Sequence, residues 1–302
     1  MTMSKSTVLT GHDQLQSDHL DSFKVAEILT NALPYIQRYD QKMVVIKYGG
    51  SAMQDETLKQ AVLSDILLLA KVGINVVIVH GGGPDINHWL EKANVQSTFV
   101  NGLRKTDADT MEIAQMVLAG KINKDLTRMI HSLGGKAIGI SGIDGGMISA
   151  TLKDPEHLGS VGEIKGVNTQ VIKDLVYKGY IPVIACIGTD ENGESCNING
   201  DEMASGIAKA LGADNFVLMS DVAGVLEDPT DLSTLIRQID IENIESLNEQ
   251  QIISGGMIPK VQCCVDAVKE SVRQAVILDG RIPHSLIVEF LTDSGIGTLF
   301  YK

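Results

Sequence analysis

From Met43 onward, short runs of β-branched residues alternate with amphipathic helical segments. The first unit is a strand predicted at 43–47, a helix over roughly 55–72 and a strand at 75–80. Further strand-like runs follow at 136–140, 181–187, 215–220 and 274–278. Strands that are connected through helices pair in parallel, and helices cover both faces of their sheet. The alternation therefore predicts an α/β fold, a three-layer α/β/α sandwich around a central, mostly parallel sheet.

Two other stretches refine this organisation. Helical periodicity covers about 107–133, whereas the shorter, glycine-rich spacing between 147 and 167 predicts a hairpin on the rim of the sheet. The segment LGADN, near 212–215, separates a helix from a strand and suggests a boundary. We therefore expect an N-terminal arm at 1–40, an N-terminal lobe at 41–213 and a C-terminal lobe at 214–302.

Charge and composition narrow the partners that the chain can have. The formal net charge is −13 and the pI is near 4.9, so the whole molecule repels nucleic acid and anionic membranes. No run of ~18 apolar residues predicts a membrane span, and no apolar signal segment opens the sequence. The four cysteines form no CxxC pair, which indicates reduced packing residues: Cys186, Cys196, Cys263 and Cys264. A cytoplasmic protein is expected, in which local positive groups meet any anionic ligand.

Two successive strands end in glycine. They read VVIKYGGS at 44–51 and VVIVHGGGP at 76–84. In an open parallel sheet, ligands bind outside the carboxyl ends of the strands, where a missing Cβ lets backbone N–H groups approach an anion. Helix N-termini just downstream add partial positive charge. Together with Lys47, which precedes the first glycine pair, these strand ends favour an anion site.

Competing glycine motifs are absent. The sequence contains neither GxxxxGK[ST] nor a GxGxxG after a strand, so the P-loop and dinucleotide fingerprints are missing. HGGG also occurs as an esterase oxyanion loop, but no GxSxG nucleophile elbow accompanies it. A phosphate or carboxylate cradle built from backbone remains, and it requires nothing of His80 beyond packing.

Several polar residues lie where strands or helices begin and end. Arg104 in NGLRKTD could clamp a carboxylate with its two-pronged guanidinium. Asn197, Asn199 and Asp201 alternate before a helix, and for Asp201 the spelling alone favours a simple N-cap over a functional role. SDVAGVL at 220–226 fits a nucleotide-edge loop or a turn, and SGGMIPK supplies Lys260 at a helix start.

The chain resembles the acetylglutamate kinases, a branch of the amino acid kinase family. KYGGS, VHGGGP, NGLRKTD, GDEMASGIAKALGAD, LMSDVAGVL and GGMIPKV occur in that family's order, and the resemblance covers about 41–302. It implies an N-terminal acceptor lobe and a C-terminal nucleotide lobe in one sandwich. It also implies transfer of the γ-phosphoryl group of ATP to the γ-carboxylate of N-acetyl-L-glutamate, in arginine biosynthesis.

The resemblance assigns the catalytic roles. It makes Lys47 and Lys260 the positive groups on the transferring phosphoryl and Asp201 their organiser. The acceptor carboxylate, with a pKa of about 4.3, is already ionised at neutral pH and needs no general base. Mg²⁺ would be held largely by ATP oxygens, and no protein ligand for a metal is assigned.

The binding residues follow from the same motifs. Backbone donors to phosphate and acceptor are Gly49, Gly50 and Gly82, with Gly83 beside the acceptor. The acetylglutamate is expected to contact Arg104, Asn197 and Asn199. The ATP site is expected to include Asp221, Val222, Ala223, Gly224, Val225, Leu226, Ile252, Ile253, Ser254 and Gly256.

The N-terminal arm carries the regulatory expectations. FKVAEILTNALPYIQRYDQ has helical spacing that Pro34 should kink, and it fits either a lid on its own domain or an arm that reaches another subunit. The resemblance favours the second, a kinked helix that interlaces dimers into a hexamer, with arginine as inhibitor between this helix and 280–298. LMSDVAGVL adds the PII nitrogen-signal protein as a candidate partner. Residues 1–20 match nothing, and 272–280 has a valine where relatives usually carry histidine.

Two rival functions stay open. One is a sibling kinase that acts on carbamate, aspartate, glutamate or a nucleoside monophosphate; Arg104 followed by two asparagines argues for the acetylated amino acid. The other is a non-catalytic arginine-sensing scaffold, against which the retention of both lysines and Asp201 argues.

Overall fold

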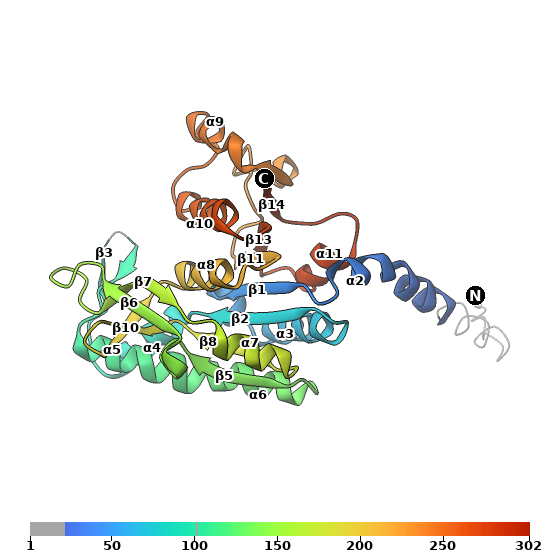
Figure 1. The fold of residues 1–302 in the computed structure, drawn as a ribbon. Helices are drawn as coiled ribbons and strands as arrows, with labels where there is room; N and C mark the ends of the chain where they lie inside the picture. Colours follow the sequence, from blue (N-terminus) through green and yellow to red (C-terminus); the bar gives the residue numbers. More distant parts are fainter. Residues whose placement is uncertain (1–21, 101) are drawn as a thin grey trace, which may run out of the picture.

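The structure, a computed structural model, describes residues 22–100 and 102–302. Its main sheet has eight strands in the order β12-β14-β13-β11-β1-β2-β8-β5 (Figure 1). These strands are β1 Met43–Tyr48, β2 Asn75–His80, β5 Ala137–Ser141, β8 Ile181–Ala185, β11 Asn215–Ser220, β12 Gln238–Asp240, β13 Gln274–Asp279 and β14 Thr298–Tyr301. All neighbouring pairs are parallel except β13 with β14. The predicted strands and the mostly parallel sheet are confirmed.

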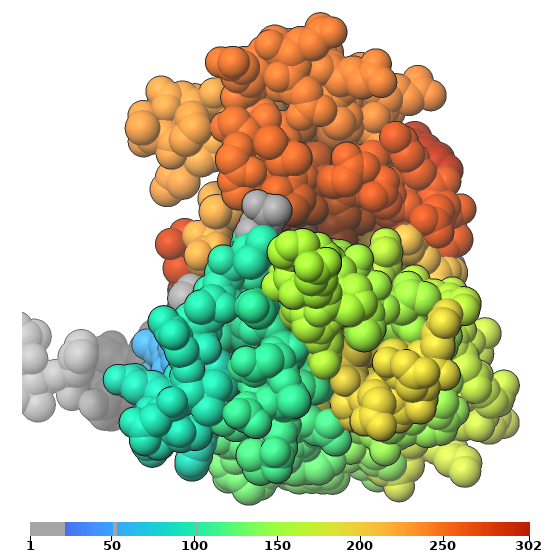
Figure 2. Space-filling view, turned by 90° about the vertical axis from the view of Figure 1, so that its left-hand side faces the viewer, coloured from blue at the N-terminus to red at the C-terminus, as the bar shows by residue number. Residues whose placement is uncertain are grey.

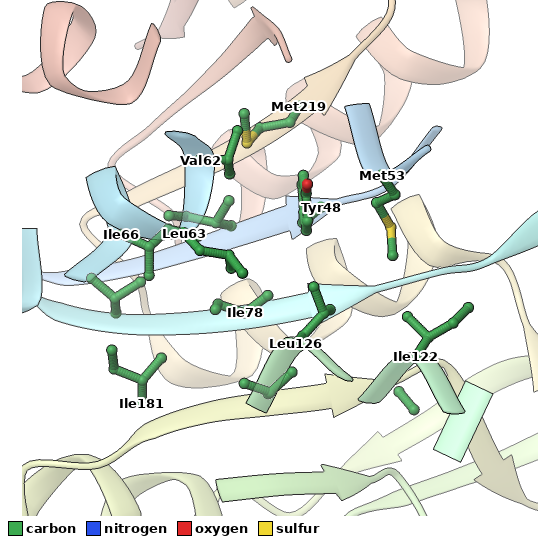
Figure 3. Close-up of a cluster of buried hydrophobic side chains, with 14 of the residues drawn as sticks. Tyr48, Met53, Val62, Leu63, Ile66, Ile78, Ile122, Leu126, Ile181 and Met219 are labelled. Atoms are coloured by element: carbon green, nitrogen blue, oxygen red, sulfur yellow. The ribbon is translucent and has the colours of Figure 1, made fainter. Parts of the chain in front are cut away.

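Helices cover both faces of this sheet and make the sandwich three-layered. Against one face lie α3 Glu56–Lys71, α4 Gly83–Lys92, α5 Ala108–Gln115, α6 Asn123–Ser132 and α11 Ser285–Leu291. Against the other lie α7 Gln170–Tyr177, α8 Gly200–Leu211, α9 Ile244–Glu249 and α10 Met257–Glu270. Figure 3 shows Ile66 of α3 in the first core, with Tyr48 and Ile78 of the sheet. Burial on both faces explains why the central strands read as continuous apolar runs.

The glycine-rich region between 147 and 167 forms the expected hairpin. β6 Ile148–Leu152 pairs antiparallel with β7 Val161–Val167. Together with β9 Ile187–Thr189 and β10 Ser195–Ile198 they close a small four-stranded sheet. The run predicted as one strand at 181–187 is therefore two, because the chain leaves the main sheet after Ala185. A two-stranded ribbon of β3 Phe99–Val100 and β4 Leu103–Arg104 lies apart from both sheets.

The helix predicted over 107–133 is interrupted by a wider turn. A π-helical segment, η2 Met116–Ile122, joins α5 to α6. Such segments are rare and are frequent at functional sites. Four short 3₁₀ turns complete the elements: η1 Gly50–Met53, η3 Asp144–Gly146, η4 Leu232–Thr234 and η5 Ile241–Asn243.

The arm is a bent helix, as Pro34 predicts. Residues 22–31 are helical, and after Ala32 a second helix, α2 Leu33–Tyr39, begins with Pro34 in its first turn. α2 packs on α11, where the rings of Tyr39 and Phe290 meet edge to face at 5.0 Å. Residues 22–31 extend away from the sandwich (Figure 1). Expectations for residues 1–20 lie outside the described residues.

The C-terminal strands and helices lie together above the rest of the sheet. Figure 2 shows this part, in orange and red, stacked on the teal, green and yellow segments of the earlier chain. β1 and β11 pair directly, so the main sheet continues from one part into the other. In the described residues we find no helix long and apolar enough to cross a membrane.

Candidate active site

The two glycine-ended strands are neighbours. β1 and β2 pair in register from Met43 with Asn75 to Tyr48 with His80. Both glycine runs therefore leave the sheet at the same edge, and a cavity of about 340 Å³ opens there. Its lining includes ten glycines and polar residues: Lys47, Gly49, Gly50, Gly82, Gly83, Arg104, Asn197, Asn199, Asp201 and the first glycine of the second run, Gly81. Nine of these ten were assigned from sequence, and the structure brings them together.

One carboxylate links the two predicted lysines. Asp201 Oδ1 lies 3.0 Å from Lys47 Nζ, and Asp201 Oδ2 lies 3.8 Å from Lys260 Nζ. Lys47 comes from β1 and Lys260 from α10, which lie on either side of α8. All three side chains are largely but not fully buried. The arrangement places two positive groups side by side, with one negative charge to hold them.

The helix that carries Asp201 is capped by another residue. Asn199 Oδ1 accepts hydrogen bonds from the backbone N–H of Asp201 at 2.9 Å and of Glu202 at 3.2 Å. The interpretation of Asp201 as a simple N-cap is therefore wrong, because the cap is Asn199. The Asn199 amide oxygen is occupied by the cap, which leaves its Nδ2 group to donate to a ligand.

Arg104 is a buried cation in the wall of the cavity. Its side chain donates to Asn87 Oδ1 at 2.6 Å, to Ser97 Oγ and to the carbonyl of Gly83 at 3.2 Å. The guanidinium also lies over the ring of Phe99, 4.7 Å from its centre. Burial lowers the pKa of Arg104 from its ordinary value. No carboxylate pairs with Arg104 among the described residues, so its positive charge is available to an anion.

Asn197 lies across the cavity on β10. Its Nδ2 group donates to Thr106 Oγ1 at 3.3 Å, two residues after Arg104. This bond ties the small four-stranded sheet to the segment that follows β4, so the two predicted acceptor contacts come from segments that hold each other.

The loop after β2 needs glycine because its backbone packs closely on η2. A Cβ at Gly82 would lie 2.2 Å from Ile122 Cδ1 and 2.9 Å from Leu118 Cδ2. A side chain at this position would therefore force the ends of Ile122 and Leu118, or the loop itself, to move. Leu118 also lines the cavity, and so does Cys186. The sequence analysis did not assign these two residues, since neither belongs to a polar or glycine motif.

The predicted nucleotide segments lie apart from this cavity, at the end of β11 and before α10. Burial alone would raise the pKa of Asp221, but hydrogen bonds from its own N–H and from Ser220, with the charges of Lys260 and Arg281, lower it. Lys260 therefore faces both Asp201 and the end of β11. Gly256 is the N-cap residue of α10, while Ile252 is half-buried and Ser254 is exposed.

Two of the predicted nucleotide residues have side chains in the core. Val225 is 0% exposed and Ile253 is 4% exposed. They could meet a ligand only through their backbone. Gly224 adopts φ +142°, and a Cβ there would lie 2.4 Å from Thr298 Oγ1. Val222, Ala223 and Leu226 are half-buried beside this turn, and Leu226 forms a bridge with Leu235.

The site has the chemistry of an anion-handling centre. Lysine ammonium groups, a buried guanidinium and glycine backbone N–H groups all complement negative oxygen atoms. No group of three or more metal-ligating side chains occurs in residues 22–100 and 102–302. The four cysteines are free, three of them are buried, and burial raises the pKa of the Cys186 thiol to about 12.

Fold and site together define a phosphotransferase of the amino acid kinase family. The model of that family matches residues 42–279, and the chain belongs to it.

Curated relatives define the branch. Acetylglutamate kinase of Clostridioides difficile is 53% identical over 277 residues, which are 92% of this chain and 97% of the relative. Acetylglutamate kinase of Thermosynechococcus vestitus is 50% identical over 92% of this chain and 94% of the relative. Within the family, the chain is one of the acetylglutamate kinases.

Solved structures support the fold. N-acetylglutamate synthase of Neisseria gonorrhoeae superposes with a TM-score of 0.79 at 23% identity, over 92% of this chain and 63% of that one. Carbamate kinase of Giardia lamblia gives a TM-score of 0.66 at 16% identity, over 87% and 99%. At these identities the likeness concerns the fold alone.

Proposed function

We propose that this chain transfers the γ-phosphoryl group of ATP, bound with Mg²⁺, to the γ-carboxylate of N-acetyl-L-glutamate in the cytoplasm. The observation that carries the proposal is the bridge from Lys47 through Asp201 to Lys260, at the rim of a cavity walled by glycine backbone. The names of the curated relatives support the substrate.

The acceptor cavity supports an acidic substrate. Arg104 is 8% exposed and has only neutral partners among the described residues, and a buried charge without a counter-ion is costly. An α-carboxylate would supply that counter-ion, and the Asn197 and Asn199 amides would meet the acetamido group. The γ-carboxylate then points toward Lys47 and the two glycine runs.

The reaction itself asks little covalent chemistry of the protein. The γ-carboxylate is ionised at neutral pH, so it attacks phosphorus without a general base. Catalysis then rests on alignment and on stabilising the charge of the transferring group. Lys47 meets that charge from the acceptor side and Lys260 from the nucleotide side. Asp201 keeps the two ammonium groups close despite their mutual repulsion.

The nucleotide is expected to lie along the end of β11 and the start of α10. The backbone around Gly224 and the turn at 252–256 would hold adenine and ribose, and Gly49, Gly50 and Gly82 would donate N–H groups to phosphate oxygens. The donor set at these strand ends suits an anion, so Mg²⁺ would be carried on ATP oxygens, where it offsets phosphate charge.

Trapping with hydroxylamine tests the function, because an acyl phosphate is converted to a hydroxamate. ATP with N-acetylglutamate should give hydroxamate, whereas ATP with free glutamate or aspartate should not. Product from free glutamate or aspartate would instead favour a sibling kinase. Absence of product from every acceptor would favour the non-catalytic scaffold.

Regulation is the finer part of the proposal. The helical residues 22–31 present apolar side chains at helical spacing, and Val25, Ile28 and Leu29 are each more than half exposed. A face of this kind fits contact with a second copy, as a hexamer built through the arm requires. α2 rests on α11, so an arginine bound between the arm and 280–298 would meet both ends of the chain.

The PII nitrogen-signal protein stays a candidate partner on the resemblance of LMSDVAGVL alone. Sedimentation of the two purified proteins, separately and mixed, tests it. A faster-sedimenting species in the mixture would support the interaction, and unchanged sedimentation would oppose it.

A further inference from the structure

We propose that His80 is a positioning residue, whose Nδ1–H group holds the Gly81 carbonyl so that the Gly82 N–H group points into the cavity. The inference rests on the proposed function, in which that N–H group donates to phosphate or acceptor oxygens. His80 ends β2, is 0% exposed and does not line the cavity, so it acts only through the loop that follows it.

The surroundings of Asn123 fix which nitrogen of His80 carries the proton. Asn123 Nδ2 lies 2.8 Å from the carbonyl of Val183 and 3.1 Å from that of Ile140, and both carbonyls can only accept. Lys124 Nζ donates to Asn123 Oδ1 at 3.1 Å, which agrees with this orientation of the amide. The third neighbour of Asn123 Nδ2 is His80 Nε2 at 3.1 Å. An amide nitrogen does not accept, and its two protons are shared among these three neighbours, so Nε2 faces it with a lone pair and carries no proton.

The proton of the neutral imidazole is then on Nδ1. His80 Nδ1 lies 3.0 Å from the carbonyl oxygen of Gly81, and a carbonyl accepts a proton from Nδ1–H. The imidazole is neutral because burial lowers its pKa to about 4. Asn123 thus sets the tautomer, and the tautomer sets the hydrogen bond to the glycine loop.

That bond orients the next N–H group. The Gly81–Gly82 peptide is trans, as are all described peptide bonds, so its C=O and N–H groups point in opposite directions. With the carbonyl held toward the His80 ring, the Gly82 N–H is directed away from it. The described residues supply no hydrogen-bond acceptor for this N–H group, which leaves it to a ligand.

A second bond holds the preceding peptide. Cys186 Sγ donates to the carbonyl of His80 at 3.0 Å. Two successive carbonyls of the loop are therefore anchored by side chains, although glycine itself imposes little on the backbone. His80, Cys186 and Asn123 are buried behind the three glycines. Through these hydrogen bonds they hold the glycine loop, which would otherwise be flexible, in one conformation.

Two substitutions at His80 separate positioning from packing. In His80→Asn the amide Nδ2 takes the place of Nδ1, as far from Cβ, and can still donate to Gly81. In His80→Gln the amide oxygen takes the place of Nε2 and can still accept from Asn123 Nδ2, and the donor to Gly81 is lost. We expect kcat to stay within about threefold of wild type in His80→Asn and to fall by about tenfold or more in His80→Gln, with KM little changed.

The controls are the same changes at His131, which also bonds a backbone carbonyl, that of Ala137 at 3.0 Å, but lies in α6 away from the cavity. His131→Asn and His131→Gln should leave kcat unchanged. Equal losses of kcat in the two His80 variants, or a larger loss in His80→Asn, would overturn the proposal, because a packing role predicts the larger loss for the smaller asparagine.

The tautomer of His80 can be determined by NMR on the wild-type protein, independently of the activity of any variant. Nitrogen NMR of the full chain labelled at its seven histidines, with His80 assigned from the His80→Asn spectrum, should show a neutral ring with its proton on Nδ1. A proton on Nε2 would overturn the proposal. A wild-type enzyme that formed no hydroxamate would count against the proposed function instead, and the NMR result would still decide the geometry of the loop.

Discussion

The acceptor cavity and the nucleotide segments at 221–226 and 252–256 are built differently. The cavity is closed by strand ends, a buried Arg104 and the capped start of α8, and its polar groups hold one another in place. The nucleotide segments are turns on the outside of the C-terminal part, and two of their side chains, Val225 and Ile253, are in the core. The side proposed for the acceptor is therefore preformed by side chains, while the side proposed for the nucleotide offers mainly backbone.

Lys47→Ala should have the largest effect on kcat, because Lys47 lies where the proposed acceptor cavity and the proposed phosphate site meet. We expect kcat to fall by about a hundredfold or more, as for loss of a group that meets charge in the transition state, while the fold stays intact. Steady-state kinetics and circular dichroism measure the two. Lys165→Ala, which removes an exposed lysine paired with Glu191, is the control and should behave as wild type. Near-normal turnover of Lys47→Ala would refute the role assigned to this residue.

Substitution of Arg104 should act on the acceptor alone. Arg104→Lys keeps the charge but loses the fork that meets a carboxylate with two parallel bonds. Loss of a hydrogen bond to a charged group costs about 1.5 to 3 kcal/mol, so KM for N-acetylglutamate should rise by about tenfold or more. KM for ATP should hardly move. An equal rise in both constants would mean that the two sides are not separate.

Gly224→Ala is the matching change on the nucleotide side. An alanine Cβ would meet Thr298 Oγ1 at 2.4 Å and Leu235 Cδ1 at 2.8 Å, and φ +142° is a strained value for it. We expect KM for ATP to rise several-fold, because the strained turn must shift to accept the methyl group. KM for the acceptor should stay constant. Thermal unfolding of the same variant reports the accompanying loss of stability. A selective rise in KM for the acceptor would reverse the assignment of the two sides.

The buried histidine behind the acceptor loop should make folding stability depend on pH. Burial, with a smaller contribution from the charge of Lys124, lowers the pKa of His80 to about 4, against an ordinary value of 6.5. Well above pH 6.5 the histidine is unprotonated in both the folded and the unfolded state. As the pH falls from 6.5 toward 4, only the unfolded chain gains the proton, and the folded state loses up to about 3 kcal/mol.

Urea unfolding of wild type and His80→Asn at pH 7 and pH 5 measures the contribution of His80 to the pH dependence of folding stability. The gap in unfolding free energy between the two proteins should narrow at pH 5, because asparagine does not titrate. A gap that is independent of pH would contradict the neutral, buried imidazole.

Removal of residues 1–38 should have the smallest effect on the basal reaction, since the described part of the arm, residues 22–38, does not line the cavity and packs on α11. Basal kcat should stay within about twofold, while the oligomer shrinks to dimers and inhibition by arginine disappears. Sedimentation and arginine titration are the measurements. A truncated protein that arginine inhibits like the full chain would contradict the proposed regulation.

Sequence alone predicted the acceptor side better than the nucleotide side, for physical reasons. Strand ends fix residues such as Lys47 and Gly82 in space, because parallel register determines which strand ends are neighbours. Asp201 was harder, since an acidic residue in a first helical turn has two readings, and only the cap by Asn199 separates them. Turns such as 252–256 carry no periodicity, and the burial of Ile253 depends on contacts distant in the chain.

Two features had no usable signal. The π-helical segment η2 has the same apolar periodicity as the helices around it, so the widened turn that places Leu118 and Ile122 beneath Gly82 could not be read from residue types. The role that we infer for His80 depends on Asn123, which is 43 residues away in sequence. A single sequence does not reveal that the two side chains meet.

The stereochemistry at phosphorus tests the central claim most directly, which is that acceptor and nucleotide bind on opposite sides of the lysine pair and react with each other without a phosphorylated protein. ATP made chiral at its γ-phosphorus, with N-acetylglutamate as acceptor, would be converted and the configuration of the product determined. One in-line transfer predicts inversion of configuration. Retention would indicate two transfers through a side chain of the enzyme and would contradict the account.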